Sequence, residues 1–306
     1  MALPALILWF SLAIDRAFGD PQSRLHPVSL LGSFIGLWGR PGLYPVWSQR
    51  FVGVFFSILT ASLFALPFYL IWNYLPVIFL IIAAPFLLKI CFAWRCLEEH
   101  VSSVEKAVSN GGGRNEVQML VSRDANRLSD EEVLSAAYES MAENLVDSII
   151  SPLFYFTIFG LPGAAFFRAV NTMDAMLGYK DHRIYLGWFP ARMDDFLNYI
   201  PARFTGAVLL FYFALKGRFR QAWKTLLRDR KKRPGFNGGI PMSVIAGGVG
   251  IEYSKPGCYV IGNPEKLLSD GGKEIFQAVR AAAIISSVIF TLLMFIFGGI
   301  MISVLF

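Results

Sequence analysis

Long apolar runs divide the chain. A membrane-spanning helix needs about 20 predominantly apolar residues, or somewhat fewer. Four runs meet or approach that length: Met1 to Ile14, Phe51 to Ile71, Pro76 to Trp94 and Ala281 to Phe306. The first is short, and it lacks the basic segment and small-residue cleavage site of a signal peptide, so we expect a retained anchor. The pattern predicts a helical protein that crosses a membrane several times.

Two further apolar runs are interrupted or short. Residues 149–167 contain Pro152, Gly160, Pro162 and Gly163, and residues 204–215 follow Pro201. Both runs either cross the membrane or dip in and return. The number of crossings is therefore six in the first case and four in the second. Irregular backbone is tolerated at membrane depth where it lines a cavity or is buried in protein. We therefore predict an all-α, polytopic integral membrane protein with broken or re-entrant segments and cytoplasmic loops.

The polar residues fall in three connections within what we predict to be a single domain, 1–306. These are 95–148, 168–203, and the basic and Gly-rich connection 216–276. In the first, a helix is expected to continue from the third run, break at "NGGGRN" and resume at "LSDEEVL". Ser129 and Glu132 have the spacing of a capping box, which predicts the start of that second helix.

The composition agrees with a membrane protein. Of the 306 residues, 55% are hydrophobic and only 16% are charged, and the mean hydropathy is +0.51, well outside the range of soluble proteins. Cys91, Cys96 and Cys258 form no CxxC pair. We expect unpaired thiols, with neither a zinc site nor a disulfide framework.

The net charge of +6 is concentrated in one segment. Residues 216–233 hold nine basic residues and one acid, a balance of +8 that leaves 6 − 8 = −2 for the rest of the chain. Because this segment follows an apolar run, the positive-inside rule explains it best, with lipid headgroup contact as a consequence. Nucleic-acid binding is the minor alternative, and no nucleic-acid partner is expected.

Acids, amides and guanidinium groups gather beside the apolar runs. Glu139, Glu143 and Asp147 recur every four residues on one helical face, which leads directly into an apolar run. A solvated acidic face is the ordinary explanation, but ionisable groups near a membrane are usually functional or paired. Arg168, Asn171 and Asp174 recur every three residues. Carboxylates and amides suit Mg²⁺, and arginines suit phosphate.

Two other segments are less specific. Asp15, Asp20 and His26 follow the first run, but a lone histidine beside a proline usually packs a turn or caps a helix. The stretch from Gly235 to Gly262 lacks the Lys-Ser or Lys-Thr pair of a P-loop. Its glycines either cradle a phosphate or permit close packing.

Taken in order, several motifs resemble the CbiB/CobD family of membrane proteins, the adenosylcobinamide-phosphate synthases. The motifs are "DRAFGDPQSRLHPV" from Asp15, "SRDANRLS" from Ser122, "ESMAENLVDSIISPLF" from Glu139, "RAVNTMDAMLGY" from Arg168, "GWFPARMDDFLNYIPAR" from Gly187 and "KPGCYVIG" from Lys255. The resemblance covers most of the chain. It departs at Ser148, where glycine is expected, and at "FNGGIPMSV", where Met242 replaces an expected carboxylate.

The resemblance implies an enzyme of cobalamin biosynthesis that joins aminopropanol phosphate to adenosylcobyric acid in an ATP-dependent amide ligation. The implied cofactors are ATP and Mg²⁺, and the implied substrates are the corrinoid and the aminoalcohol phosphate. The implied location is the cell membrane, and the protein either acts alone or forms a homo-oligomer. The resemblance supports these positions as motif members, and their individual roles are our hypothesis. We assign catalysis to Asp20, His26, Glu139, Asn144 and Asn171. We assign substrate and phosphate binding to Arg123, Asp124, Arg168, Arg192, Asn198 and Arg203. We assign Mg²⁺ binding to Glu143, Asp147 and Asp174, with Asp194 and Asp195 as reserve ligands.

Two other classes of protein share some of these features. A transporter of a small anionic or corrinoid solute also has discontinuous helices and intramembrane acids. Here the charged motifs lie in connections, and no inverted repeat is visible. A non-catalytic regulatory member of the superfamily would have lost several motif acids, most of which this chain keeps.

The predicted cytoplasmic position of the polar loops can be tested by cysteine accessibility. In a background without native cysteines, Asp181→Cys and Arg230→Cys should be labelled from the same side of the membrane by an impermeant maleimide. Labelling from opposite sides would refute the single-face arrangement and favour one full crossing by each interrupted run, of which only 204–215 lies between these two positions.

Overall fold

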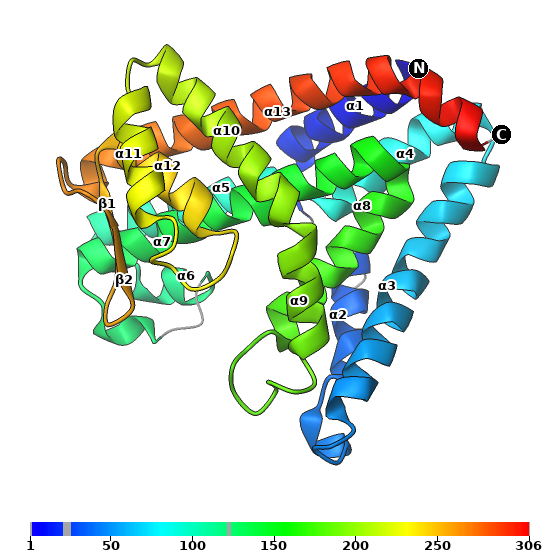
Figure 1. The fold of residues 1–306 in the computed structure, drawn as a ribbon, viewed down its shortest axis with the longest axis horizontal. Helices are drawn as coiled ribbons and strands as arrows, with labels where there is room; N and C mark the ends of the chain where they lie inside the picture. The colour runs from blue at the N-terminus through cyan, green and yellow to red at the C-terminus, as the bar shows by residue number, and fades with distance from the viewer. Residues whose placement is uncertain (1, 21–25, 121–123, 306) are drawn as a thin grey trace. The chain divides into compact units, whose positions relative to one another are not determined.

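The computed structural model describes residues 2–20, 26–120 and 124–305, with side chains described as far as Ile296. It confirms an all-α fold (Figure 1). The α-helices are α1 (Ala2–Phe18), α2 (Pro27–Trp38), α3 (Gln49–Tyr74), α4 (Val77–Cys91), α5 (Trp94–Ser109), α6 (Arg114–Gln118), α7 (Asp130–Leu145), α8 (Ser151–Leu177), α9 (Trp188–Leu197), α10 (Tyr199–Leu215), α11 (Phe219–Asp229), α12 (Gly239–Val249) and α13 (Leu268–Leu305). Short helical turns are η1 (Pro41–Leu43), η2 (Ala125–Arg127) and η3 (Val146–Ile150), and β1 (Glu252–Lys255) pairs with β2 (Tyr259–Gly262).

Four helices of the described chain are long and apolar enough to cross a membrane. They are Gln49–Tyr74, Val77–Ser109, Asp130–Leu177 and Leu268–Ile296, and the bent pair α9 and α10 raises the number to five if it forms one span. The first apolar run forms α1, a helix of 17 residues, which is not among these candidates. The interrupted run 149–167 instead belongs to one of them, because its helix extends well beyond the apolar residues on both sides.

The chain folds into two compact units. The first contains Met1–Ala93, Ser151–Asn198 and Ser287–Phe306, and the second contains Trp94–Ile150 and Tyr199–Ser286. These units are divisions by spatial contact. The assignment of residues 1–306 to one domain stays a prediction.

The first unit has its main core where α2 and α3 pack against α8. Buried Ile35, Trp38 and Met173 belong to this cluster. The Trp38 ring stacks on Phe56 with centroids 5.5 Å apart, and its indole N–H donates to Thr60 Oγ1 at 3.1 Å. The polar atom of a buried tryptophan needs such a partner, so this contact fixes α2 against α3.

Helix α8 bends sharply at Gly160, as the interrupted sequence predicts (Figure 1). Gly160 has φ 67° and ψ −157°, a conformation essentially restricted to glycine. The segments on either side of the bend pack together, since the Tyr155 and Phe167 rings stack at 5.3 Å. A side chain at Gly163 would meet the Tyr155 carbonyl oxygen at 2.6 Å. The glycines therefore allow the chain to fold back on itself.

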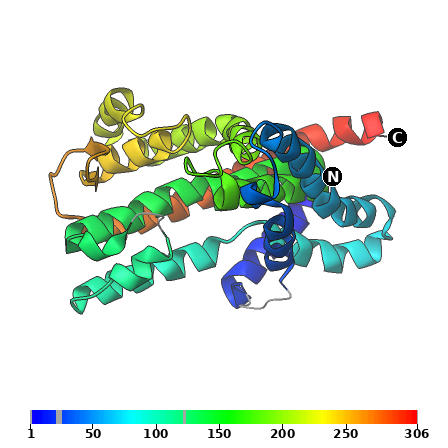
Figure 2. The same cartoon turned by 90° about the horizontal axis from the view of Figure 1, so that it is seen from below.

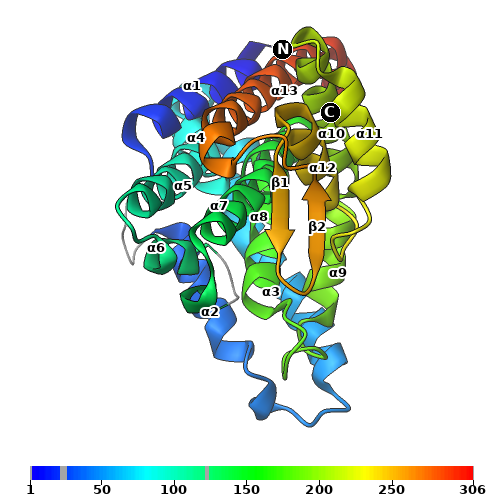
Figure 3. The ribbon, with the colours of Figure 1, turned by 90° about the vertical axis from the view of Figure 1, so that its left-hand side faces the viewer.

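In the second unit, α7 lies beside α5 (Figure 2) and contacts β1 and α12. The capping box is confirmed: the Glu132 N–H donates to Ser129 Oγ, and the Ser129 N–H donates to Glu132 Oε2. The predicted break at "NGGGRN" separates α5 from α6. The hairpin of β1 and β2 lies against α12 (Figure 3), and nothing in the apolar pattern indicated these two short strands.

The glycines of "AGGVG" serve close packing. A Cβ on Gly247 would meet Thr225 Oγ1 at 2.5 Å, and a Cβ on Gly248 would lie 2.4 Å from the Phe213 ring. These contacts bring α12 against α10 and α11. Of the two explanations offered for this stretch, the structure supports packing at these two positions.

Replacing Gly160 should destabilise the protein more than replacing another helical glycine. In Gly160→Ala, the new Cβ would meet the Trp72 ring at 2.6 Å and hold a conformation that costs a non-glycine residue about 1–3 kcal/mol. Gly36→Ala is the matched control, because a Cβ there meets nothing within 4 Å. Thermal unfolding in detergent should show a clearly lower Tm for Gly160→Ala only. Equal Tm values would argue against the bend.

Candidate functional site

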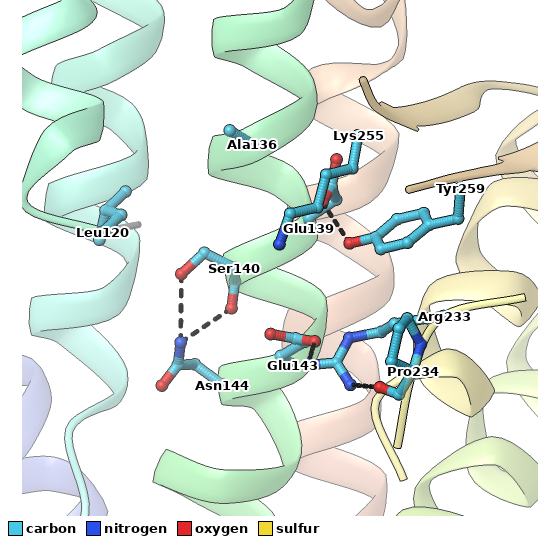
Figure 4. A pocket seen from close by; sticks show the side chains of 10 residues that line it. All are labelled: Leu120, Ala136, Glu139, Ser140, Glu143, Asn144, Arg233, Pro234, Lys255 and Tyr259. Atoms are coloured by element: carbon cyan, nitrogen blue, oxygen red, sulfur yellow. Dashed lines mark hydrogen bonds and ion pairs between the residues drawn. The ribbon is translucent and has the colours of Figure 1, made fainter. Parts of the chain in front are cut away.

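A cavity of about 290 Å³ opens on one face of α7, within the second unit (Figure 4). Helix α7 contributes Ala136, Glu139, Ser140, Glu143 and Asn144 to its wall. This is the face predicted from the four-residue spacing of the acids. The remaining wall consists of Leu120, Arg233, Pro234, Lys255 and Tyr259. Two carboxylates and two basic side chains thus line one small cavity.

Glu139 is buried, with only 6% of its surface exposed. Its two oxygens accept hydrogen bonds from Ser135 Oγ at 2.7 Å and from Tyr259 Oη at 2.6 Å. Burial and the charge of Glu139 raise the pKa of Tyr259 far above its ordinary value. Tyr259 therefore stays protonated and donates to the carboxylate. The Ser135 hydroxyl also accepts from the Ser254 N–H at 2.8 Å, which attaches the hairpin to α7.

Glu143, one turn further along α7, forms an ion pair with Arg233. Burial of Arg233 opposes its charge, but the Glu143 carboxylate outweighs that effect and the pKa of Arg233 is raised. A Cβ at Gly238 would come within 2.7 Å of Glu143 Oε1 and 2.9 Å of Arg233 Cζ. Glycine is thus required where the chain passes this ion pair.

Asn144 is held by its own helix. Its amide N–H group donates to the Ser140 carbonyl oxygen at 2.9 Å and to Ser140 Oγ at 3.2 Å. The Ser148 hydroxyl donates to Asn144 Oδ1 at 2.9 Å. Ser148 lies in η3, a single π-helical turn, and such turns often occur at functional sites. The departure from the expected glycine at Ser148 therefore orients a predicted catalytic amide.

A second cluster lies in the first unit, between α8 and α9. Asp194 is buried and accepts from Asn171 Nδ2 at 3.2 Å and from Asn198 Nδ2 at 2.9 Å. Asn198 Oδ1 in turn accepts from Ser151 Oγ at 2.6 Å. Asp174 lies close enough to Asp194 for their charges to repel. This cluster joins four of the predicted residues: Asn171, Asp174, Asp194 and Asn198.

A third cluster, also in the first unit, surrounds Lys89. Its ammonium group lies 3.0 Å from Asp15 Oδ1 and 2.6 Å from Asp20 Oδ1. His26 Nδ1 accepts from the Val28 N–H at 3.4 Å, so His26 caps α2, as the ordinary interpretation predicted. Burial lowers the pKa of His26, and the charges of Lys89 and Arg168 act in the same direction. With Nδ1 occupied and Asp20 paired to Lys89, neither side chain is placed as a free base.

The other predicted residues have local partners or lie elsewhere. Asp124 Oδ1 caps η2 by accepting from the Asn126 N–H at 3.0 Å. Arg192 pairs with Asp195 at 3.6 Å, and Arg203 packs over the Tyr199 ring and donates to Asn237 Oδ1 at 3.2 Å. Asp147 lies in η3 and acts on Arg233 through its charge. Arg123 lies outside the described residues.

The predicted Mg²⁺ ligands fall into two sets. Glu143 and Asp147 belong to the second unit, whereas Asp174, Asp194 and Asp195 belong to the first. Within the part of the chain that the structure describes, no three His, Cys, Asp or Glu side chains form a metal-binding group. Mg²⁺ is often held by one or two carboxylates together with substrate phosphates. The pair Asp174 and Asp194 fits that simpler arrangement, and the metal assignments stay predictions.

Three ionisable residues of the cavity are not among the residues predicted from the sequence: Arg233, Lys255 and Tyr259. Arg233 ends the basic segment 216–233, and the positive-inside rule accounts for the charge of that segment without any role in a site. Lys255 is the last residue of β1 and Tyr259 is the first residue of β2, and the two form a cross-strand pair. Both are in the motif "KPGCYVIG", so the signal was present, but its residues were given no chemical role.

Comparison with known proteins defines the family. The model of the family described as CobD/Cbib protein matches residues 8–288. A protein of Methanothermobacter thermautotrophicus named "Probable cobalamin biosynthesis protein CobD" is 38% identical over 94% of this chain and 95% of its own length. "Cobalamin biosynthesis protein CobD" of Dehalococcoides mccartyi is 36% identical over 84% of this chain and 86% of its own length. A protein of Pyrococcus abyssi, also named "Probable cobalamin biosynthesis protein CobD", is 40% identical over 84% of this chain and 85% of its own length.

This polytopic helical chain belongs to the CobD/Cbib family, as its motifs indicated. No solved structure matches it.

One buried acid supports the hairpin that carries Lys255 and Tyr259. Asp229, at the end of α11, accepts from the Gly262 N–H at 2.9 Å and pairs with Arg228 at 2.6 Å and Lys232 at 2.8 Å. Burial alone would raise the pKa of Asp229, but these hydrogen bonds outweigh it and lower the pKa to about 2. The ionised form of Asp229 is therefore favoured in the folded protein.

This shift predicts a pH dependence of stability. Because the folded pKa lies below the ordinary 3.8, the stabilisation is complete above about pH 4 and disappears as the pH falls towards 2. The stability difference between the wild type and Asp229→Asn should shrink by about 2 kcal/mol over that range. Thermal unfolding of both proteins in detergent at successive pH values measures this stability difference. A difference that stays constant would contradict the proposed ion pairing.

Proposed function

We propose that this chain is an adenosylcobinamide-phosphate synthase, which joins aminopropanol phosphate to the propionate of adenosylcobyric acid in an ATP-dependent amide ligation. Membership of the CobD/Cbib family, over almost the whole chain, is the observation that carries the proposal. The names of its relatives support a role in cobalamin biosynthesis. The ligation step rests on the chemistry of the motif residues.

Amide formation from a carboxylate needs an activated acyl group. In the proposed reaction, the propionate oxygen attacks the γ-phosphorus of ATP and ADP leaves. The amine then attacks the acyl carbon, loses a proton and expels phosphate. Positioning of the three substrates and neutralisation of their charges are the main requirements for such a reaction.

The described clusters offer suitable groups for these requirements. Asp174 and Asp194 are the carboxylates best placed to hold a phosphate-bound Mg²⁺, which would offset the charge of the nucleotide when bound. Asn171 and Asn198 fix the orientation of Asp194 through their amide groups. In the other unit, the cavity on α7 offers acidic and basic groups for a small charged substrate.

The proposed location is the cytoplasmic face of the cell membrane. ATP is available on that side, and the basic segment 216–233 favours the same orientation by the positive-inside rule. Four or five apolar helices provide the anchorage.

The direct test uses the full chain in membranes or nanodiscs supplied with adenosylcobyric acid, aminopropanol phosphate, ATP and Mg²⁺. We expect adenosylcobinamide phosphate, detected by mass spectrometry, and one ADP for each amide formed. Absence of product with correctly folded protein, or product without ATP, would contradict the proposal. Uptake of corrinoid into proteoliposomes without conversion would support a transporter instead.

The assay also tests the predicted metal ligand Asp147. Asp147→Asn should lower product formation at least about 100-fold, the size expected when a well-placed electrostatic group is removed. Asp270→Asn is the control, since Asp270 is exposed on α13, outside all three clusters. Normal activity of Asp147→Asn, at equal amounts in the membrane, would remove the proposed role of Asp147.

A further inference from the structure

We infer that the cavity on α7 binds a small zwitterion, an aminoalkyl phosphate, with its phosphate on Arg233 and Lys255 and its ammonium group on Glu139 and Glu143. This assignment rests on the proposed function, in which such a molecule is the amine donor. It gives Glu143 a cation from the substrate as its partner in place of the predicted metal ion.

The charge pattern of the wall is the first argument. Figure 4 shows two carboxylates along α7, with Arg233 and Lys255 approaching the same face from other segments. The formal charge of the wall is zero. A nucleotide or free phosphate would place only negative groups beside two carboxylates, whereas an aminoalkyl phosphate offers the carboxylates an ammonium group and the basic side chains a phosphate.

The size of the cavity is the second argument. Its volume of about 290 Å³ is at the lower end of the roughly 300–1,000 Å³ found for pockets that hold drug-sized ligands. A molecule with a three-carbon chain, one amine and one phosphate fits this space. A corrinoid ring is far too large for it.

The state of the ion pairs is the third argument. Lys255 forms no ion pair with another described residue, and its charge acts on Glu143 across the cavity. Glu143 itself is paired with Arg233. The pair is only half-buried, with 27% of each side chain exposed, but removing one partner still leaves the other charge poorly compensated. A phosphate alone would take Arg233 and leave Glu143 unpaired, but a zwitterion gives both a new partner.

The hairpin makes the arrangement precise. Lys255 and Tyr259 face each other across the strands, and Tyr259 is held by its hydrogen bond to Glu139 at 2.6 Å. Helix α7 therefore sets the position of the residue opposite Lys255. The turn between them contains Gly257 with φ 70°, a left-handed conformation that glycine adopts without strain.

The test measures binding to the purified full chain in detergent, without ATP or corrinoid, by isothermal titration calorimetry. The probes are 1-amino-2-propanol O-phosphate, inorganic phosphate and 1-amino-2-propanol. Each fragment forgoes the hydrogen bonds of one charged end, so the zwitterion should bind at least about 10-fold more tightly than either fragment. Equal affinity for inorganic phosphate and the zwitterion would overturn the assignment.

Variants locate the binding. Lys255→Met should weaken binding of the zwitterion by about 10- to 100-fold, and Lys255→Arg should restore most of it, which separates loss of charge from loss of folding. Lys224→Met is the matched control, because Lys224 is exposed on α11 and does not line the cavity. Unchanged affinity in Lys255→Met would also overturn the assignment.

The outcomes separate this inference from the proposed function. If the zwitterion binds and Lys255→Met loses it, but no amide product forms, the synthase proposal fails and the binding site stands. If product forms and Lys255→Met leaves the KM for the amine donor unchanged, the synthase proposal stands and this assignment fails.

Discussion

Compensation of two carboxylates on α7, the buried Glu139 and the half-buried Glu143, is the constraint on which the second unit depends. Glu139 and Glu143 lie one turn apart on a helix most of whose residues are buried. Carboxylates removed from water destabilise a fold strongly unless they gain hydrogen bonds or opposite charges. Here Tyr259 and Ser135 satisfy Glu139, and Arg233 satisfies Glu143. The chain between the basic segment and the hairpin is therefore held against one helix face.

The supporting contacts follow from that constraint. Glycine at 238 lets the backbone pass the Glu143–Arg233 pair, and Asp229 anchors the far end of β2 through the Gly262 N–H. The hairpin is too short to be stable by itself, since an isolated two-stranded hairpin is marginal in water. Its attachment to α7 and α11 makes it a rigid wall of the cavity. Such rigidity is what a site for a small charged ligand requires.

The first unit solves the same problem with different partners. Asp15 and Asp20 share Lys89, which neutralises charge with charge. Asp194 instead receives two amide hydrogen bonds from Asn171 and Asn198 and has no basic partner among these contacts. An ion pair of the first kind is mainly structural, whereas a carboxylate oriented by neutral amides remains available to a cation. This difference separates two clusters that look alike in the sequence.

The sequence by itself determined the all-α membrane fold, the start of α7 at its capping box, the bend at Gly160 and the acidic face of α7, because these depend on local periodicity, caps and backbone freedom. It also identified the family, since ordered motifs are specific. Only the tertiary structure decided which partners the charges have. Arg233 looked like one more residue of a basic segment, and His26 like a candidate base, until their neighbours from distant parts of the chain were known. Burial and pairing, which set the chemistry of an ionisable group, arise from contacts between segments that no local pattern records.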